Sequence, residues 1–187
     1  MKNKGILLII TILVIIVFLA LFKNSILKIF YPKKYEDIVS ICAEQYMVDE
    51  NLIYAVIKAE SDFEEDAVSN KDALGLMQIM EETAKDIAKK YDIKISEENA
   101  REDILLVSNN IKIGTKYLSV LLEKYQITEL ALAAYNAGIG NVDNWIQKNI
   151  LNEDGSDIEN VPYKETNNYV RKILQNYKIY NMLYNKN

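Results

Sequence analysis

An unbroken apolar run near the start of the chain constrains its fold more than any other feature. Residues 5–22 read GILLIITILVIIVFLALF, and Thr11 is the only residue among them with a polar side chain. As an α-helix this run would be about 27 Å long, close to the thickness of the hydrocarbon core of a bilayer. Such a run can be a membrane-spanning helix, a cleaved signal peptide or a buried core helix.

The residues that end the run favour an uncleaved anchor. The apolar part of a signal peptide is usually shorter and is followed by small residues at the cleavage site, whereas Leu19, Leu21 and Phe22 are bulky. We therefore expect residues 1–22 to form a single-pass membrane anchor, residues 23–34 a juxtamembrane segment and residues 35–187 a separate domain. More lysines follow the run than precede it, which opposes export of the domain, but long domains cross the membrane largely regardless of flanking charge.

The rest of the chain has the periodicity of helices. The whole chain contains only two prolines and six glycines, so helix breakers are rare. Apolar side chains recur at helical spacing near residues 35–47, 52–60, 81–91, 106–125, 128–138, 141–146 and 165–184. Asp49 and Thr128 are expected to cap the helices that follow them, and Glu81 is expected to open one. No stretch alternates with a period of two, so the sequence predicts an all-α domain with at most a short hairpin within residues 74–80.

Composition excludes several kinds of chemistry. The chain has no histidine, so it lacks Ser-His-Asp and Cys-His machinery and the usual zinc sites. Neither a P-loop nor a dinucleotide fingerprint occurs, and we expect no metal and no cofactor. Cys42 is the single cysteine; it cannot form an internal disulfide, and we expect it to be buried on a face with Ile38 and Ile41. The net charge is −5 with both signs interspersed, so we expect no nucleic-acid partner.

Catalysis in such a chain must use carboxylates, hydroxyls, amides or lysine, and Glu60 is the candidate carboxyl. It follows Val56 and Ile57 by four and three positions, so it projects from the apolar face of its helix. It also lies near the helix C-terminus, where the macrodipole is negative. Burial and the dipole both disfavour the carboxylate, so the pKa should be raised, as a general acid requires. Taken alone, a glutamate at a helix end is more often simply solvated.

Three motifs accompany Glu60. Ser61 follows it directly, Ser69 comes nine positions after it, and Gly-Leu-Met-Gln occupies residues 75–78. Ala-Tyr-Asn-Ala-Gly stands at residues 134–138 and Val-Pro-Tyr-Lys-Glu-Thr at residues 161–166. In order and spacing these motifs resemble those of the soluble-lytic-transglycosylase (SLT)-type enzymes, glycoside hydrolase family 23, over most of the chain after the anchor.

The resemblance implies a lysozyme-like helical domain with Glu60 as its catalytic residue. It implies that Tyr135 forms a hydrogen bond near the catalytic carboxyl and that Glu165 binds the peptide-bearing or N-acetyl part of the substrate. The positions that it implies for substrate binding are Ser69, Gln78, Met80, Tyr135, Asn136 and Glu165. Two residues depart from the family pattern: Asp72 replaces a usual glycine, and Glu81 replaces a usual proline.

The family activity implied for this chain is that of a membrane-anchored peptidoglycan lytic transglycosylase. It would cleave the β-1,4 bond between N-acetylmuramic acid and N-acetylglucosamine and leave 1,6-anhydromuramyl ends, with Glu60 as a single acid and base. Two alternatives stay open: a goose-type-lysozyme-like hydrolase, and a catalytically idle glycan-binding scaffold of a wall-spanning secretion, conjugation or sporulation apparatus. The expected partners are peptidoglycan strands and the membrane, and the expected form is a monomer in the cell membrane with its domain extracytoplasmic.

Overall fold

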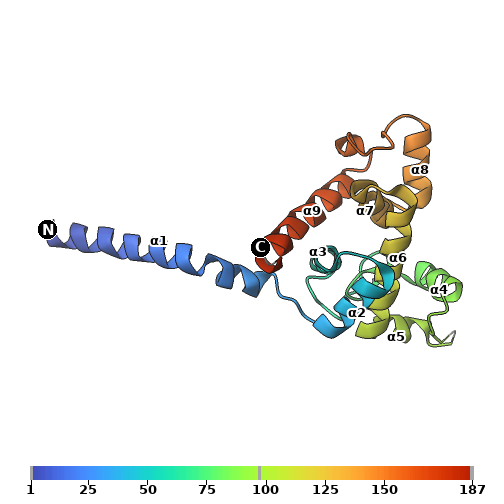
Figure 1. Cartoon of the computed structure of the whole chain (residues 1–187), viewed down its shortest axis with the longest axis horizontal. Coiled ribbons are helices and arrows are strands. Elements are labelled where there is room, and N and C mark those ends of the chain that lie inside the picture. The colour runs from blue at the N-terminus through green and yellow to red at the C-terminus, as the bar shows by residue number, and fades with distance from the viewer. Residues whose placement is uncertain (1, 97, 186–187) are drawn as a thin grey trace.

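The computed structural model describes residues 2–96 and 98–185. Residue 1 of the predicted anchor and residues 97, 186 and 187 of the predicted domain lie outside the described residues. A long N-terminal helix leads into a helical body (Figure 1). In chain order the elements are α1 (Lys2–Phe30), α2 (Glu36–Tyr46), α3 (Glu50–Glu60), β1 (Ala73–Leu74), β2 (Ile79–Met80), α4 (Glu81–Lys90), α5 (Ala100–Leu105), α6 (Val107–Tyr125), α7 (Thr128–Ala137), α8 (Ile139–Gln147), the 3₁₀ turn η1 (Ile158–Asn160) and α9 (Lys164–Tyr184).

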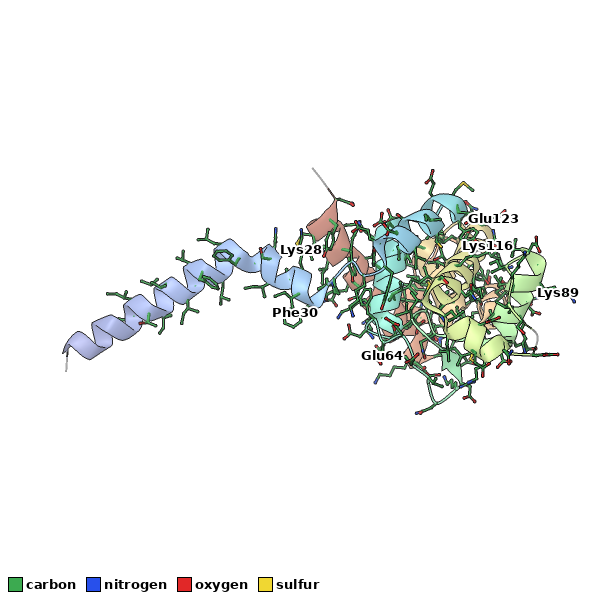
Figure 2. All side chains as sticks on the ribbon, turned by 90° about the horizontal axis from the view of Figure 1, so that it is seen from below. Lys28, Phe30, Glu64, Lys89, Lys116 and Glu123 are labelled. Atoms are coloured by element: carbon green, nitrogen blue, oxygen red, sulfur yellow. The ribbon has the colours of Figure 1, made fainter. Side chains whose placement is uncertain are left out.

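Helix α1 continues past the end of the apolar run. After Gly5, no glycine or proline occurs until Pro32, which lies just beyond the end of the helix. Within the described residues, the segment Ile9–Phe30 is long and apolar enough to cross a membrane, with a mean hydropathy of 2.5 and none of its most apolar stretch buried. Figure 2 shows α1 extending away from the helical body, with side chains on all sides of the helix and with Lys28 and Phe30 at the end nearer to the body.

Helix α3 lies at the centre of the body. All of its residues from Asn51 to Ile57 are buried, and it packs against both α9 and α2. Helix α7 packs against both α6 and α9, so the long helices enclose a common core. This arrangement places Glu60, the last residue of α3, where α3 emerges from that core.

The predicted hairpin is present and is fixed to α6 by a buried asparagine. Strands β1 and β2 are antiparallel, with Ala73 opposite Met80. The Asn110 amide donates to the carbonyls of Leu74 and Ile104 at 2.9 and 3.0 Å, and its oxygen accepts from the Met77 N–H at 2.8 Å. The Gly75 backbone has φ of +69°, and a Cβ there would lie 2.4 Å from the Asn110 amide nitrogen. The close approach therefore requires glycine at this position.

Several local expectations are confirmed and others are wrong. The Asp49 side chain accepts from the N–H groups at the start of α3, as predicted. Thr128 is the first residue of α7 and caps nothing; the residue at the cap position is Ile127. Helix α5 was not predicted, and α8 begins at Ile139, two residues before the expected start.

The expected burial of Cys42 is confirmed, whereas the face proposed for it is not. Cys42 is buried, and burial raises the pKa of its thiol. Ile41 is 62% exposed. Adjacent residues of a helix lie about 100° apart around its axis, and in α2 Cys42 faces the core while Ile41 faces away from it.

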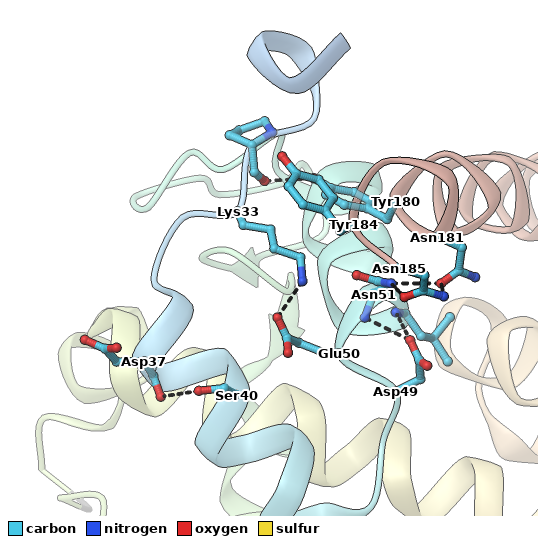
Figure 3. A network of polar contacts seen from close by, with 12 residues as sticks. Lys33, Asp37, Ser40, Asp49, Glu50, Asn51, Tyr180, Asn181, Tyr184 and Asn185 are labelled. Carbon is cyan, nitrogen blue, oxygen red and sulfur yellow. Dashed lines mark hydrogen bonds and ion pairs between the residues drawn. The ribbon is translucent and has the colours of Figure 1, made fainter. Parts of the chain in front are cut away.

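Residues just after α1 are bound to the body (Figure 3). The hydroxyls of Tyr184 and Tyr180, near the end of α9, donate to the backbone carbonyls of Tyr31 and Pro32 at 2.7 and 3.0 Å. Lys33 forms an ion pair with Glu50 at 2.7 Å. The end of α1, the start of α3 and the end of α9 thus meet at one junction.

Candidate active site

The residues that the sequence singled out lie in one cleft. It has a volume of about 360 Å³ and opens between the C-terminus of α3, the hairpin and the N-terminus of α9. Its lining includes Glu60, Ser69, Gln78, Met80, Tyr135, Asn136 and Glu165, together with Asn70, Lys71 and Ala73. A hollow of about 300 Å³ adjoins it and extends toward Thr83 and Tyr117. The fold therefore brings together positions that are up to 105 residues apart in the sequence.

Glu60 has the environment expected for an acid that is protonated near neutral pH. Burial raises the pKa of its carboxyl to about 7, against a hydrogen bond from Tyr169 and the charge of Lys172, which both lower it. Its position at the C-terminal end of α3 adds the negative end of the helix dipole. Both protonation states are therefore populated near pH 7.

Tyr169 is the residue that sequence reasoning missed. Its hydroxyl donates to Glu60 Oε1 at 2.5 Å, from the buried face of α9. Burial, followed by the nearby Glu60 charge, raises the Tyr169 pKa well above its usual value, so the phenol stays protonated and remains a donor. Its place four positions after Glu165, just beyond the third motif and on the same helix face as Glu165, was the signal that could have identified it.

Lys172, one turn further along α9 than Tyr169, is the second residue of this helix that acts on the Glu60 carboxyl. Its ammonium donates to the Ala59 carbonyl at 2.5 Å, one of the free carbonyls at the end of α3. The lysine therefore fixes the end of α3 against α9 and places a positive charge near Glu60.

Tyr135 and Asn136 on α7 hold neighbouring parts of the cleft. The Tyr135 hydroxyl donates to the Met77 carbonyl at 2.9 Å, so the hydrogen bond to Glu60 comes from Tyr169 and not from Tyr135. Asn136 Oδ1 accepts from the Thr166 hydroxyl at 2.7 Å, which joins α7 to the first turn of α9. The amide N–H groups of Asn136 are thus available to donate hydrogen bonds to a ligand.

Ser69 and Gln78 shape the loop that forms one wall. Ser69 Oγ accepts from the backbone N–H groups of Lys71 and Ala73 at 3.2 and 3.0 Å. The Gln78 amide nitrogen donates to the carbonyls of Ala67 and Gly75 at 3.0 and 2.9 Å. Each side chain retains one function for a ligand: the Ser69 O–H as a donor and the Gln78 carbonyl as an acceptor.

Ser61 and the two methionines complete the wall. The Ser61 hydroxyl donates to the Leu76 carbonyl at 2.9 Å and thereby joins the end of α3 to the hairpin loop. Met77 is fully buried and packs against Gly114, where a Cβ would lie 2.6 Å from its sulfur. Met80 is 45% exposed and lines the cleft. Met77 therefore belongs to the core, and Met80 presents an apolar surface to a ligand.

Comparison with known proteins identifies the family. Residues 37–156 match the family model described as the transglycosylase SLT domain. This chain belongs to that family. The resemblance inferred from the three motifs is thus confirmed. We refer to the helical body as the SLT domain, although α9 lies beyond the residues that match the family model.

Two curated relatives are membrane-bound lytic murein transglycosylases C. The protein from Edwardsiella ictaluri is 39% identical over 121 residues, and the protein from Yersinia enterocolitica is 38% identical over 117 residues. Each alignment covers 58% of this chain and 32% of the relative, so the chain spans about a third of the length of these relatives.

Solved structures confirm the predicted all-α, lysozyme-like SLT fold. An inactive mutant of the lytic transglycosylase Slt from Pseudomonas aeruginosa matches with a TM-score of 0.73 and 30% identity, over 83% of this chain and 25% of that one. The 70 kDa soluble lytic transglycosylase from Escherichia coli matches with a TM-score of 0.75 and 27% identity, over 86% of this chain and 26% of that one.

The two departures of this SLT domain from the family pattern have structural explanations. Asp72 has φ of +61°, in the left-handed region that glycine adopts freely and aspartate tolerates better than most residues. Its carboxylate lies 3.7 Å from the Arg101 guanidinium. Glu81 opens α4 and pairs with Lys85 at 2.6 Å, which lowers the pKa of Glu81. An acidic side chain is favourable in the first turn of a helix, so the usual proline is dispensable there.

Proposed function

We propose that this chain is a lytic transglycosylase that cleaves peptidoglycan at the β-1,4 bond between N-acetylmuramic acid and N-acetylglucosamine. The observation that carries the proposal is a glutamate whose pKa is raised to about 7, in a cleft lined by amides and hydroxyls. Those groups match the hydroxyl and N-acetyl groups of the sugars. The names of the curated relatives support the same activity.

In the first step Glu60 acts as the general acid. Its Oε1 accepts the Tyr169 hydrogen bond, which leaves Oε2 to carry the proton toward the glycosidic oxygen. Proton transfer to that oxygen makes N-acetylglucosamine a neutral leaving group, and the C1–O bond of muramic acid breaks. The N-acetyl oxygen of muramic acid stabilises the cation that develops at its anomeric carbon.

In the second step the same carboxylate acts as the base. It accepts the proton of the muramic acid 6-hydroxyl while that oxygen bonds to C1. The 6-hydroxyl belongs to the same sugar, and its high effective concentration favours it over water. The product is a 1,6-anhydromuramyl end, formed without net addition of water.

The second candidate function is hydrolysis of the same bond. The presence of a second carboxyl, that of Glu165, in the cleft favours it. Glycosidases that hydrolyse usually use two carboxyls, and Glu165 also lines the cleft. Glu165 is, however, 71% exposed and pairs with Lys71, which suits binding better than activation of a buried water. The carboxylates that follow Glu60 are engaged or exposed: Asp62 pairs with Lys58, and Glu65 accepts from Tyr35.

Mass spectrometry of digested peptidoglycan tests the proposal. The full chain, purified in detergent, is incubated with cell walls beside the Glu60→Gln variant. We expect the unmodified chain to produce anhydromuramyl ends and the Glu60→Gln variant to produce none. Reducing ends, one water heavier, would establish the hydrolase, and intact walls with bound protein would establish a glycan-binding scaffold.

We also propose that α1 anchors the protein in the cell membrane as a single pass, with the SLT domain on the side that faces the peptidoglycan. The exposed apolar surface of Ile9–Phe30 supports the anchor, and the proposed substrate supports the orientation. Protease added to intact protoplasts should then remove the SLT domain. Protection of the domain would reverse the orientation, and a shortened soluble form would indicate cleavage of α1.

A further inference from the structure

Lys71 occupies a distinctive place in the cleft. It lines both the cleft that contains Glu60 and the adjoining hollow, and it is the one basic side chain among the described residues that line either. The other cation near Glu60, Lys172, is engaged with the Ala59 carbonyl at the end of α3. Any anionic group of a ligand in this cleft therefore has Lys71 as its cationic partner.

The backbone that carries Lys71 is held in a tight turn. The Ser69 N–H donates to the Ala73 carbonyl at 3.0 Å, and the Asp72 N–H donates to the Ser69 carbonyl at 3.0 Å. Ser69 Oγ accepts from the Lys71 N–H itself. Asp72 completes the turn in the left-handed conformation. The base of Lys71 is thus fixed relative to the cleft, whereas its side chain is 75% exposed and able to change rotamer.

The partner of Lys71 lies across the rim of the cleft. Its ammonium is 3.3 and 3.4 Å from the two carboxylate oxygens of Glu165, on the first turn of α9. Both side chains are more than 70% exposed. Exposed pairs of this kind contribute little to stability, so another carboxylate can replace Glu165 at small cost.

We propose that Lys71 is a specificity residue that binds a carboxylate of the glycan strand by exchanging it for Glu165. The proposal rests on the proposed function, since it takes muramic acid as the sugar in the cleft. The lactyl group of muramic acid ends in a free carboxylate when the stem peptide is absent. When the peptide is present, the lactyl group is an amide and the peptide supplies the carboxylates. Either source presents the same chemistry to the ammonium.

Three substrates separate the sources: strands freed of peptide by an amidase, uncross-linked strands that keep their peptides, and strands whose carboxylates are converted to neutral amides. We expect Lys71→Ala in the full chain to raise KM about fivefold on a carboxylate-bearing substrate. The change in kcat should stay below about twofold, because Lys71 does not touch the reacting atoms. Lys71→Arg keeps the charge and should restore most of the affinity.

Lys85→Ala is the matched control. It also removes an exposed lysine from a pair with a glutamate, but Lys85 lies on α4 outside the lining of the cleft. Its KM should equal that of the unmodified chain. Added salt should raise KM for the unmodified chain more than for Lys71→Ala, because salt screens the exposed contact.

If Lys71→Ala raises KM on peptide-free strands, the carboxylate that Lys71 binds is that of the lactyl group. If it raises KM on peptide-bearing strands, that carboxylate belongs to the peptide. The proposal would be overturned if Lys71→Ala and the unmodified chain had equal KM values on each of the three substrates. It would also be overturned if Lys71→Ala raised KM on the amidated strands as much as on the carboxylate-bearing strands. Binding of the same strands to Glu60→Gln, with and without Lys71→Ala, tests it independently of turnover. Absence of cleavage by the unmodified chain would contradict the proposed function alone.

Discussion

At the scale of single residues, the carboxyl of Glu60 is tuned by opposing influences. Burial favours its protonated form, whereas the Tyr169 hydroxyl and the Lys172 charge favour the ionised form. The resulting pKa of about 7 suits the proposed mechanism, in which Glu60 donates a proton and then accepts one. Tyr169 therefore acts as a positioning residue that also limits how far the pKa rises.

Glu60→Gln should abolish cleavage and stabilise the fold. The amide preserves the shape but cannot donate a proton, and loss of a general acid typically costs about 10² to 10⁴-fold in rate. The folded pKa lies above the value of an exposed glutamate, so the folded protein binds more protons between about pH 4.5 and 7 and loses stability as the pH rises through that window. Denaturant unfolding at pH 8 should show the variant about 1 to 3 kcal/mol more stable. Substantial residual cleavage would assign the acid to another residue.

Tyr169→Phe should shift the pH dependence of turnover upward. The Tyr169 hydroxyl stabilises the Glu60 carboxylate, so its loss raises the Glu60 pKa further. A general acid works in its protonated form, so the alkaline limb of the kcat profile should move to higher pH, by about one unit. Tyr163→Phe is the control, because Tyr163 is exposed and outside the cleft lining. A shift to lower pH would contradict the assignment.

Asp72 allows a test of backbone conformation. Asp72→Gly should change the free energy of unfolding by less than about 1 kcal/mol, since glycine accepts the left-handed backbone but is more flexible when unfolded. Asp72→Val should cost about 2 kcal/mol, because a β-branched side chain is strained at positive φ. Urea unfolding of both variants measures the difference. Equal stabilities would mean that the turn has relaxed to a different conformation.

At the scale of elements, the hairpin is positioned by contacts from distant helices. The Asn110 side chain on α6 forms hydrogen bonds with the Leu74 carbonyl and the Met77 N–H of the hairpin and with the carbonyl of Ile104. The Ser61 hydroxyl at the end of α3 donates to the Leu76 carbonyl. These contacts fix the hairpin whose residues Gln78 and Met80 line the cleft together with Glu60. The two-residue strands are too short to hold this geometry by themselves.

Asn110→Leu tests this support. The leucine leaves the Leu74 and Ile104 carbonyls and the Met77 N–H without their partner, which should cost about 3 kcal/mol or more. Turnover should fall as well, because the wall of the cleft loses its fixed position. Urea unfolding and kcat are the measurements, with the exposed neighbour Ser108→Ala as the control. A fully stable variant would show that the hairpin holds its place through other contacts.

At the scale of the whole molecule, α9 connects the cleft to the end of α1, the proposed anchor. Glu165 and Tyr169 lie at its cleft end, and Tyr180 and Tyr184 bind the residues that follow α1. The rise from Tyr169 to Tyr184 is about 22 Å along the helix. The cleft is thus held away from the end of α1 by the length of a rigid helix (Figure 1).

The junction predicts where a soluble fragment should begin. A fragment from residue 31 keeps the two tyrosine hydrogen bonds and the Lys33–Glu50 pair, whereas a fragment from residue 35 loses them. These contacts together should contribute about 2 kcal/mol, or roughly 5 °C in Tm. Both fragments should show helical circular dichroism. Equal Tm values would mean that residues 31–34 add nothing to the fold.

The helical fold and the candidate residues were accessible from the sequence because both depend on local information. Apolar spacing predicted the helices, and motif order predicted seven of the ten positions that line the cleft. The boundaries were less accurate: α5 was missed, and the helix expected to end near residue 22 continues to Phe30. Composition marked the end of the apolar run, but only Pro32 ends the helical conformation.

By itself, the sequence determined that this is an all-α chain with one apolar helix of membrane-spanning length and one carboxyl suited to acid catalysis, since periodicity, apolar length and residue type are properties of short segments. Tertiary structure decided which phenol meets that carboxyl, because Tyr169 and Glu60 are 109 residues apart and meet only when α9 packs on α3. It also decided that Asn110 holds the hairpin and that Lys71 reaches Glu165. Such contacts follow from how helices pack together, and no local pattern encodes them.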